Sequence, residues 1–335
     1  MRVLVTGAAG FVGAATTHRL LNRGDDVVGI DNLSPYYDPK LKSARVDHLS
    51  KKDHFEFIQM DCADQDGMAK LFQEGKFDAV IHLAAQAGVR HSLEHPFAYL
   101  EANLNGFLTV LEGCRHHDIT HLVYASSSSV YGSNQNLPFS VEDSVDHPIS
   151  LYAATKKSNE HMAHVYAHLY GVPCTGLRFF TVYGPWGRPD MALFRFVDAI
   201  LKNEPIPVFG EGEQTRDFTY IDDIVEGVLR TLDTPATGNP NWDPQSPDPG
   251  TSAAPWRVYN IGGGQPVPLL RFISCIETCL NKKAVMDFLP MQPGDVRHTE
   301  ADVQALSEAV GYTPSTPIDD GIPRFVEWYR DYYQV

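Results

Sequence analysis

The chain opens with a short apolar stretch, residues 2–6, followed at once by Gly7, Gly10 and Gly13, and a helical pattern then runs to Arg23. Strand, glycine turn and helix in this order constrain the fold more than any other feature. Glycines let the backbone approach a pyrophosphate, and the free N–H groups of a helix N-terminus attract it. The spacing moves the first glycine by one position from the usual G-x-G-x-x-G. We predict a dinucleotide site here; the alternative is a tight structural turn.

A second predicted strand, residues 26–30, ends in Asp31, eighteen residues beyond Gly13. An acid near this distance typically hydrogen-bonds the adenosine ribose hydroxyls. Its charge would repel a 2′-phosphate, and no Arg follows immediately, so the sequence favours NAD over NADP. The alternative is a loop acid that starts the turn at Asn32.

Two further predicted strands lead toward the same site. The predicted strand of residues 55–60 is followed by Asp61, which could contact the adenine or merely cap the next helix. Residues 79–85 are a near-continuous apolar run, as expected for a central parallel strand, and its small last residues leave room for a cofactor. A helix predicted from Pro96 is interrupted by Asn103, an amide that would need a specific partner on a buried face.

The reacting groups are predicted at the next strand and the helix after it. Residues 126–129 are four serines at the end of a predicted parallel strand, the edge where doubly wound sheets bind ligands. Tyr152 and Lys156 share one face of a predicted helix. An ammonium one turn away favours the phenolate of a group whose ordinary pKa is ~10, so the pair can accept a proton. Chance also produces such pairs, so this assignment depends on the rest of the site.

We therefore expect an α/β fold with two parts. Residues 1–178 would form a doubly wound parallel sheet of the Rossmann type, and residues 179–335 a smaller α/β substrate domain, with some strands and helices returning to the first. Residues 34–54 are either a flap near a ligand or a solvated loop. Residues 235–256, rich in Pro, Gly, Asn and Ser, resemble a mobile surface insertion.

Composition excludes several classes of protein. The net charge of -15 argues against nucleic-acid binding, although a few local arginines could still bind an anionic small molecule. No apolar run reaches the ~18 residues of a membrane span, and the first residues lack the features of a signal peptide, so a cytoplasmic location is expected. The five cysteines are odd in number and scattered, which predicts buried thiols instead of disulfides or a metal site.

Taken together, these motifs resemble the extended short-chain dehydrogenase/reductase superfamily over essentially the whole chain. Within it the sequence is most similar to nucleotide-sugar 4-epimerases, specifically the branch that acts on UDP-glucuronate. Residues 35–39, 126–132 and above all 178–190 (RFFTVYGPWGRPD) carry the resemblance. It implies an isomerase that interconverts UDP-glucuronate and UDP-galacturonate with a permanently bound NAD. It also implies a homodimer that pairs through helices near residues 97–115 and 152–169.

The resemblance assigns catalytic roles. Tyr152 would take the proton of the sugar 4-hydroxyl, and Lys156 would lower the pKa of Tyr152 and hold the nicotinamide ribose. Ser127 would be the helper hydroxyl, with Ser128 and Ser129 close by. The 4-keto sugar would then turn over in the site, and hydride would return to its other face. The expected cofactor contacts are Gly7, Gly10, Phe11, Val12, Gly13, Asp31, Asn32, Asp61, Cys62, Leu83, Ala84, Ala85, Asn103, Tyr152 and Lys156.

It also assigns the substrate contacts. Arg216 would clamp the diphosphate, Val208 and Phe209 would lie near the uracil, and Asp295 near the ribose. Gln292 stands where many galactose-type members carry Arg, which leaves the second phosphate contact open.

An acidic sugar oxidised at carbon 4 is a β-keto acid that loses carbon dioxide easily, so its carboxylate must be held. Arg188 and Thr181 offer donors for it, with Arg90 as a second candidate cation and Ser127 nearby. The alternative for Arg188 is a solvated loop arginine.

Rival functions remain. A UDP-glucose 4-epimerase would not need Arg188. The 4,6-dehydratases carry Thr-Asp-Glu where residues 127–129 are serines, and UDP-glucuronate decarboxylases carry Glu at the position of Ser129. A dinucleotide-binding sensor or structural subunit would tend to lose Tyr152 or Lys156.

Overall fold

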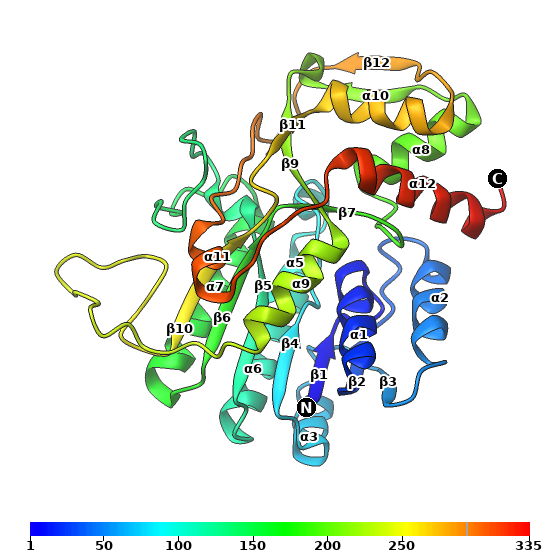
Figure 1. Ribbon diagram of the computed structural model, residues 1–335. Coiled ribbons are helices and arrows are strands. Elements are labelled where there is room, and N and C mark those ends of the chain that lie inside the picture. The colour runs from blue at the N-terminus through cyan, green and yellow to red at the C-terminus, as the bar shows by residue number, and fades with distance from the viewer. Residues whose placement is uncertain (293) are drawn as a thin grey trace.

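The computed structural model describes residues 1–292 and 294–335. Its centre is a seven-stranded parallel sheet in the order β10-β6-β5-β4-β1-β2-β3 (Figure 1). The strands are β1 (Arg2–Thr6), β2 (Asp26–Asp31), β3 (Phe55–Gln59), β4 (Ala79–His82), β5 (His121–Ser127), β6 (Cys174–Phe179) and β10 (Trp256–Ile261). The order reverses beside β1, which creates the crevice where such sheets bind ligands. The predicted doubly wound fold is confirmed.

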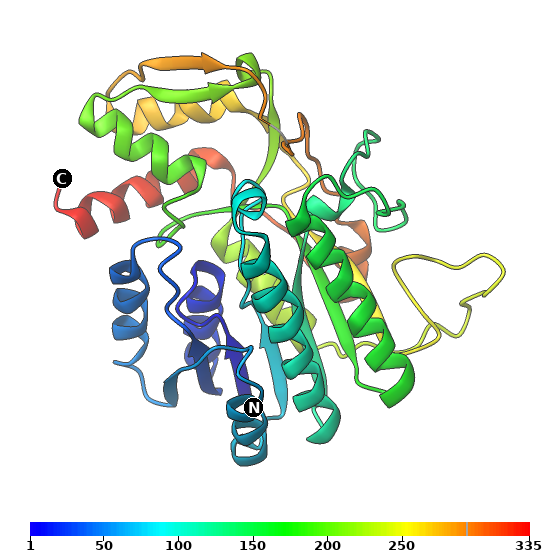
Figure 2. The same ribbon diagram turned by 180° about the vertical axis from the view of Figure 1, so that it is seen from behind.

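Helices cover both faces of this sheet because parallel strands bury both of their sides. One face carries α1 (Phe11–Arg23), α2 (Pro39–Leu49), α9 (Ile221–Leu232) and α11 (Gln304–Val310). The other carries α3 (Gln65–Gly75), α4 (His91–Glu94), α5 (Pro96–Tyr99), α6 (Gly106–His116) and α7 (Leu151–Tyr170) (Figure 2). The helix predicted from Pro96 is broken: a turn of π-helix, η1 (Leu100–Asn105), separates α5 from α6.

A smaller lobe lies above the carboxyl edge of the sheet. It contains a three-stranded sheet of β7 (Thr181–Tyr183), β9 (Thr215–Tyr220) and β11 (Pro266–Pro268), and the pair β8 (Ile206–Phe209) and β12 (Met286–Leu289). Around them pack α8 (Ala192–Lys202), α10 (Leu269–Leu280) and α12 (Ile318–Tyr333). The single turns η2 (Ser128–Tyr131) and η3 (Gly210–Gly212) complete the helices of the described residues.

The two parts share one hydrophobic core. The cluster beneath α1 and α9 continues through Phe218 and Phe272 of the smaller lobe to Phe325 of α12. Because β10 and α9 follow residue 179 in the chain yet lie in the layers of the large sheet, the boundary at residues 178/179 stays a prediction.

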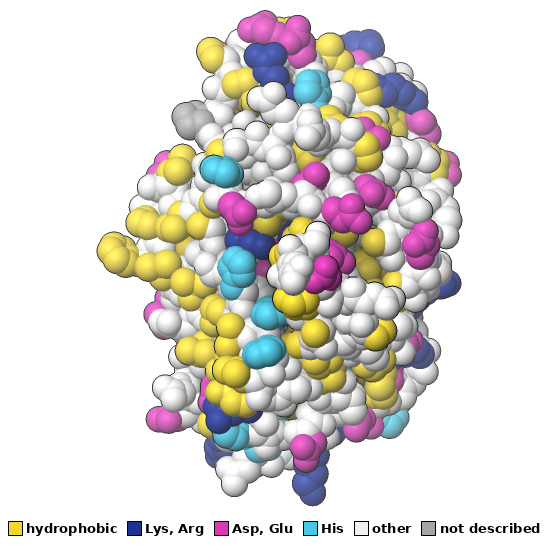
Figure 3. Space-filling view, turned by 90° about the vertical axis from the view of Figure 1, so that its left-hand side faces the viewer, with side chains coloured by type: hydrophobic (Ala, Val, Ile, Leu, Met, Phe, Trp, Pro, Cys, Tyr) yellow, Lys and Arg dark blue, Asp and Glu magenta, His cyan; other side chains and the backbone are white. Residues whose placement is uncertain are grey.

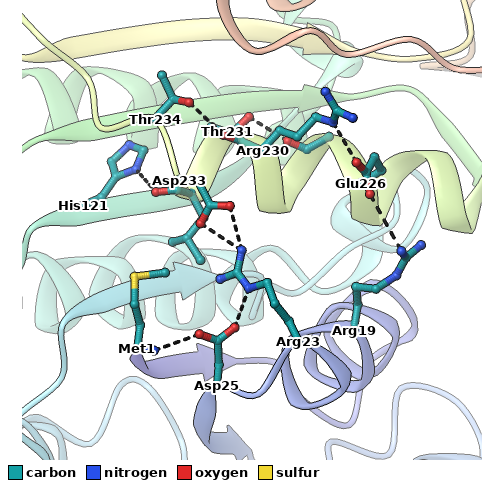
Figure 4. Close-up of polar contacts among 12 residues, drawn as sticks. Met1, Arg19, Arg23, Asp25, His121, Glu226, Arg230, Thr231, Asp233 and Thr234 are labelled. Atoms are coloured by element: carbon teal, nitrogen blue, oxygen red, sulfur yellow. Dashed lines mark hydrogen bonds and ion pairs between the residues drawn. The ribbon is translucent and has the colours of Figure 1, made fainter.

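Ion pairs connect the start of the chain, the end of α1 and the end of α9 (Figure 4). The Met1 amine lies 2.9 Å from Asp25 Oδ1, and Arg23 Nε donates to Asp25 Oδ2 at 2.6 Å. Arg23 Nη1 also donates to Asp233 Oδ2 at 2.7 Å, which ties the end of α1 to the end of α9. In the described part of the chain, no helix has both the length and the hydropathy that crossing a bilayer demands.

Candidate active site

A cavity of about 630 Å³ lies between the carboxyl edge of the large sheet and the smaller lobe. It brings together most of the residues that the sequence predicted for cofactor and substrate. Those on its wall are Gly7, Gly10, Phe11, Val12, Gly13, Asp31, Asn32, Asp61, Cys62, Leu83, Ala84, Ala85, Arg90, Ser127, Ser128, Ser129, Tyr152, Lys156, Thr181, Arg188, Phe209, Arg216 and Asp295.

The glycine turn fits a dinucleotide pyrophosphate. Gly7 has φ +71°, and a Cβ at Gly13 would lie 2.0 Å from the Gly7 oxygen, so both positions require glycine. Gly10 caps α1 without any side-chain hydrogen bond, so the first N–H groups of this helix are free toward the cavity. Free helix N–H groups and the positive end of the dipole are what a phosphate requires.

Asp31, the acid predicted for the adenosine ribose, lies on the cavity wall and is held by two backbone N–H groups. Its Oδ2 accepts from Ala9 N at 3.2 Å, and its Oδ1 accepts from Leu33 N at 2.8 Å. Lys42 Nζ lies 3.7 Å from Oδ1; burial lowers the pKa of Lys42, and the charge of Asp31 opposes that shift. Lys42 lines the cavity. The sequence did not predict this position, because residues 34–54 were interpreted as either a flap near a ligand or a solvated loop.

Tyr152 and Lys156 reach the cavity from the first two turns of α7, which begins behind the N-cap Ser150. Lys156 is buried, and its Nζ donates to Ala125 O at 2.9 Å. Burial lowers the pKa of Lys156 to about 8. Burial raises the pKa of Tyr152, because it disfavours the charged phenolate. The Ser127 hydroxyl and the charge of Arg188 act in the opposite direction.

This outcome differs from the electrostatic argument made from the sequence. The pKa of Tyr152 is shifted mainly by burial, and then in the opposite direction by the Ser127 hydroxyl and the charge of Arg188. The physical reason is that desolvation acts on both members of the pair and the Lys156 ammonium is directed at a strand-end carbonyl. The shared helical face of the two residues is as expected.

Arg188 lines the cavity from the loop between β7 and α8. Its Nε donates to Asp190 Oδ1 at 3.0 Å and its Nη2 to Asp190 Oδ2 at 2.5 Å. Tyr36, from the loop after β2, donates to Asp190 Oδ2 at 3.1 Å. Arg188 is therefore not a solvated loop arginine: its side chain is only 23% exposed.

A second cationic group lies near β8 and β9. Arg216 donates to the Thr215 and Arg297 carbonyls at 3.0 and 2.8 Å and to Gln214 Oε1 at 2.9 Å, all of them uncharged partners. Burial lowers the pKa of Arg216, with the charge of Asp295 opposing. A guanidinium without a bonded carboxylate, on a cavity wall, suits a diphosphate.

Arg90 belongs to this second group. It donates to Asp295 Oδ2 at 2.7 Å and lies 4.8 Å from the centre of the Phe209 ring. Two residues predicted for the substrate thus pair with each other, and Arg90 lies beside Phe209. Arg188, Arg195 and Arg216 are the other arginines on the wall of this cavity.

Three predicted contacts do not line the cavity. Val208 is fully buried in the core, since successive strand residues point to opposite faces and its neighbour Phe209 takes the cavity side. Gln292 stays off the wall and forms a turn through its carbonyl, which accepts from Asp295 N at 3.2 Å.

The third is Asn103, which acts one layer behind the wall. Its amide accepts from Gln86 N at 2.8 Å and donates to Gln86 O at 3.1 Å and Thr155 Oγ1 at 3.0 Å. It thereby fastens the loop after β4 to the helix that carries Tyr152.

Several wall residues carried no predicted role. Tyr36 and Asp190 lie within motifs that carry the family resemblance, and Arg195 lies outside them. The paired tyrosines in residues 35–39 were the available signal, because aromatic side chains in a polar segment need a packing partner.

A dinucleotide-binding sheet edge that shares one cavity with a Tyr–Lys pair defines a short-chain dehydrogenase/reductase type of enzyme. The chain belongs to the NAD dependent epimerase/dehydratase family, whose profile matches residues 3–262.

Similar proteins narrow the class. A probable UDP-glucuronate 4-epimerase of Rhizobium meliloti (strain 1021) is 48% identical over 335 residues, covering 100% of this chain and 98% of its own. UDP-glucuronate 4-epimerase 3 of Arabidopsis thaliana is 46% identical over 99% of this chain and 77% of its own length. The crystal structure of UDP-glucuronic acid 4-epimerase from Bacillus cereus with UDP-glucuronic acid and NAD matches with a TM-score of 0.88 and 37% identity, over 99% of this chain and 100% of that one.

Proposed function

We propose that the chain is a UDP-glucuronate 4-epimerase that interconverts UDP-glucuronate and UDP-galacturonate by oxidation at sugar carbon 4, rotation of the keto sugar and re-reduction. One observation carries the proposal beyond the family. The cavity that holds the glycine turn and Tyr152 also holds Arg188, and the charge of Arg188 acts on the pKa of Tyr152. A cation this close to the base is what a carboxylate on the neighbouring carbon would need.

Tyr152 is the proposed proton acceptor. When the 4-hydroxyl donates its proton to the Tyr152 oxygen, the Ser127 hydroxyl stabilises the phenolate by the same contact that now opposes the rise in pKa. NAD, when bound, takes the hydride from carbon 4 and later returns it to the opposite face, so it is regenerated and stays with the protein. Tyr152 then gives its proton back to the new 4-hydroxyl.

Lys156 has a holding role in this proposal. Its ammonium is fixed by the Ala125 carbonyl at 2.9 Å, directly below the serines, where it can donate to the nicotinamide ribose.

The substrate is held at both ends. Arg216 is the proposed diphosphate contact, with Phe209 beside the uracil and Asp295 near the ribose. Arg188 and Thr181 hold the sugar carboxylate, which keeps the 4-keto acid from losing carbon dioxide. The serines at 127–129 supply no carboxyl group for an elimination, so they favour epimerisation over dehydration.

The test is incubation of the purified protein with UDP-glucuronate without added nucleotide or reductant, followed by chromatography of the products. We expect UDP-galacturonate, and NAD released from the denatured protein. UDP-xylose as the product would indicate a decarboxylase, turnover of UDP-glucose alone a neutral epimerase, and no turnover a binding role.

We also propose that two copies pair through the helices on the α6–α7 side. Large apolar side chains are exposed along these helices, including Phe97 at 81% and Leu169 at 61%. Figure 3 shows hydrophobic side chains gathered along the left margin of the view, which is the side of the molecule that carries these helices. Patches of this kind mark protein interfaces. Light scattering should give twice the chain mass, and Leu169→Glu should reduce it to one chain.

The cysteines suit a reducing compartment, and we propose the cytoplasm. All five are free thiols, and four of them are buried. Equal electrophoretic mobility of freshly lysed protein with and without a reductant would support this; a mobility shift would count against it.

A further inference from the structure

Arg188 is already paired with a carboxylate in this structure. Two of its N–H groups donate to the two oxygens of Asp190, at 3.0 and 2.5 Å, and Tyr36 adds a third donor to the same carboxylate at 3.1 Å. Arg188 and Asp190 both line the cavity. Arg188, the proposed cation for the sugar carboxylate, therefore already has a counter-ion within the protein.

Asp190 does not use all the donors of Arg188, so a second carboxylate can begin to bind before Asp190 is released. A guanidinium has five N–H donors in a planar fork, and Asp190 takes the edge formed by Nε and Nη2. Arg188 shares the cavity wall with Tyr152, and its charge acts to lower the pKa of Tyr152, which burial raises. The guanidinium therefore faces the same cavity as its internal partner Asp190 and the proposed proton acceptor.

Rotation of the keto sugar creates a physical problem at this position. For hydride to return to the other face, the sugar carboxylate must give up its first set of contacts and form new ones. A guanidinium that is left unpaired while mostly buried is costly, and Arg188 is only 23% exposed, so that cost would add to the barrier for rotation.

We propose that Asp190 is a placeholder carboxylate, which pairs fully with Arg188 whenever the sugar carboxylate does not. Substrate entry, rotation and product release then become exchanges of one carboxylate for another at the same guanidinium. This inference rests on the proposed function, and it makes Asp190 a residue that sets both specificity and rate. Asp190 weakens the binding of the acidic sugar by Arg188. In return, the sugar carboxylate can dissociate from Arg188 more easily.

A purely structural role for Asp190 predicts the opposite sign for binding. If Asp190 only fixed the loop that carries Arg188, its loss would disorder the guanidinium and weaken UDP-glucuronate. If it is a competing partner, its loss makes Arg188 a stronger site for the acid while turnover becomes slower.

The experiment uses Asp190→Asn, which keeps the shape of the side chain and removes its charge. Binding is measured by calorimetry in a Tyr152→Phe background, in which turnover should be strongly slowed and NAD should be retained. We expect UDP-glucuronate to bind about five- to tenfold more tightly than in the Tyr152→Phe parent, and UDP-glucose to change less than about twofold. With Tyr152 restored, kcat on UDP-glucuronate should fall about tenfold, and the absorbance of reduced nicotinamide should rise during turnover, because the unrotated keto sugar accumulates.

Asp198→Asn is the matched control. Asp198 also accepts from a cation and a phenol, Lys202 Nζ at 2.8 Å and Tyr329 OH at 2.7 Å, but it does not line the cavity. It should change neither binding nor kcat. A double variant of Asp190→Asn with Arg188→Ala should lose the gain in affinity, because the gain acts through Arg188.

Weaker or unchanged binding of UDP-glucuronate by Asp190→Asn would overturn the inference, provided that the parent protein prefers the acid. If the parent binds UDP-glucose as tightly as UDP-glucuronate, the proposed function itself fails. The parent measurement therefore separates the two failures.

Discussion

Replacing Glu160 by glutamine breaks a fully buried ion pair beneath the serine edge. Glu160 and Arg178 have no exposed side-chain surface, and Arg178 donates to both Glu160 oxygens, at 2.8 and 3.0 Å. Ser126, next to the helper serine, donates to Glu160 Oε1 at 2.7 Å. The variant keeps the shape of the side chain but leaves the Arg178 cation without its counter-ion.

The expected loss follows from that burial. Removing one partner of a buried pair costs about 3–5 kcal/mol, because the other charge remains desolvated. Unfolding entropy near the midpoint is about 2.1 cal/mol/K per residue, or roughly 700 cal/mol/K for 335 residues. A loss of about 4 kcal/mol therefore lowers the midpoint of thermal unfolding by about 6 °C.

The loss should also depend on pH. The charge of Arg178 holds the pKa of Glu160 below its ordinary value of 4.5 against the effect of burial. A carboxyl whose folded pKa is lowered contributes stability that is fully present above the unfolded pKa and disappears as pH falls through the folded one. The difference between parent and Glu160→Gln should therefore be constant near neutrality and shrink only in acid below 4.5.

Differential scanning calorimetry at several pH values is the assay, with Glu226→Gln as the control. Glu226 also accepts from an arginine Nε, that of Arg230 at 2.7 Å, but its side chain is 42% exposed (Figure 4). An exposed pair contributes less than about 1 kcal/mol, so the midpoint should move by less than about 1.5 °C. Equal shifts for the two variants would refute the reasoning that burial sets the cost.

Three further predictions concern the site. Tyr152→Phe should retain NAD and lose about 10²- to 10⁴-fold in kcat, since it lacks the proton acceptor; near-normal rates would remove Tyr152 from the mechanism. Arg188→Ala should lower kcat/KM on UDP-glucuronate about 10- to 100-fold more than on UDP-glucose, and equal losses would deny it the carboxylate. Burial lowers the pKa of Lys156 to about 8 from 10.5, so between these values the unfolded chain holds a proton that the folded chain has lost. The stability of the cofactor-free protein to urea should accordingly rise with pH across this window, and Lys156→Met should flatten that rise; an unchanged slope would contradict the assignment.

Features that depend on neighbours in the sequence were predictable. The glycine turn, the acid ending the second strand and the Tyr152–Lys156 spacing are set by backbone geometry over a few residues, and the structure brings them to one cavity. The family of the chain followed from the same residues.

Pairings between distant segments were not predictable. Arg90 meets Asp295 across 205 positions, and Tyr36 meets Asp190 across 154. Such contacts are decided by how four loops converge above the sheet, which no local pattern encodes. Lys42 escaped notice for the same reason, since a lysine in a polar segment gives no sign that it will be buried.

Two errors came from incomplete physics. Val208 and Phe209 were both directed at the uracil, although the two-residue period of a strand allows only one of them to face a cavity. The pKa of Tyr152 was argued from the charge of Lys156 alone, and desolvation, which acts on both groups, was left out of that argument.

The position of β10 has a consequence for how this chain is made. On the ribosome, β6 is complete long before Trp256–Ile261 emerges, and until then the outer side of β6 offers an unpaired row of N–H and C=O groups. A nascent chain that stops between β6 and β10 would expose the unpaired edge of β6. Chaperones or another copy of the chain could bind to that edge. Separate expression of a fragment that ends before β10 should for that reason yield aggregates.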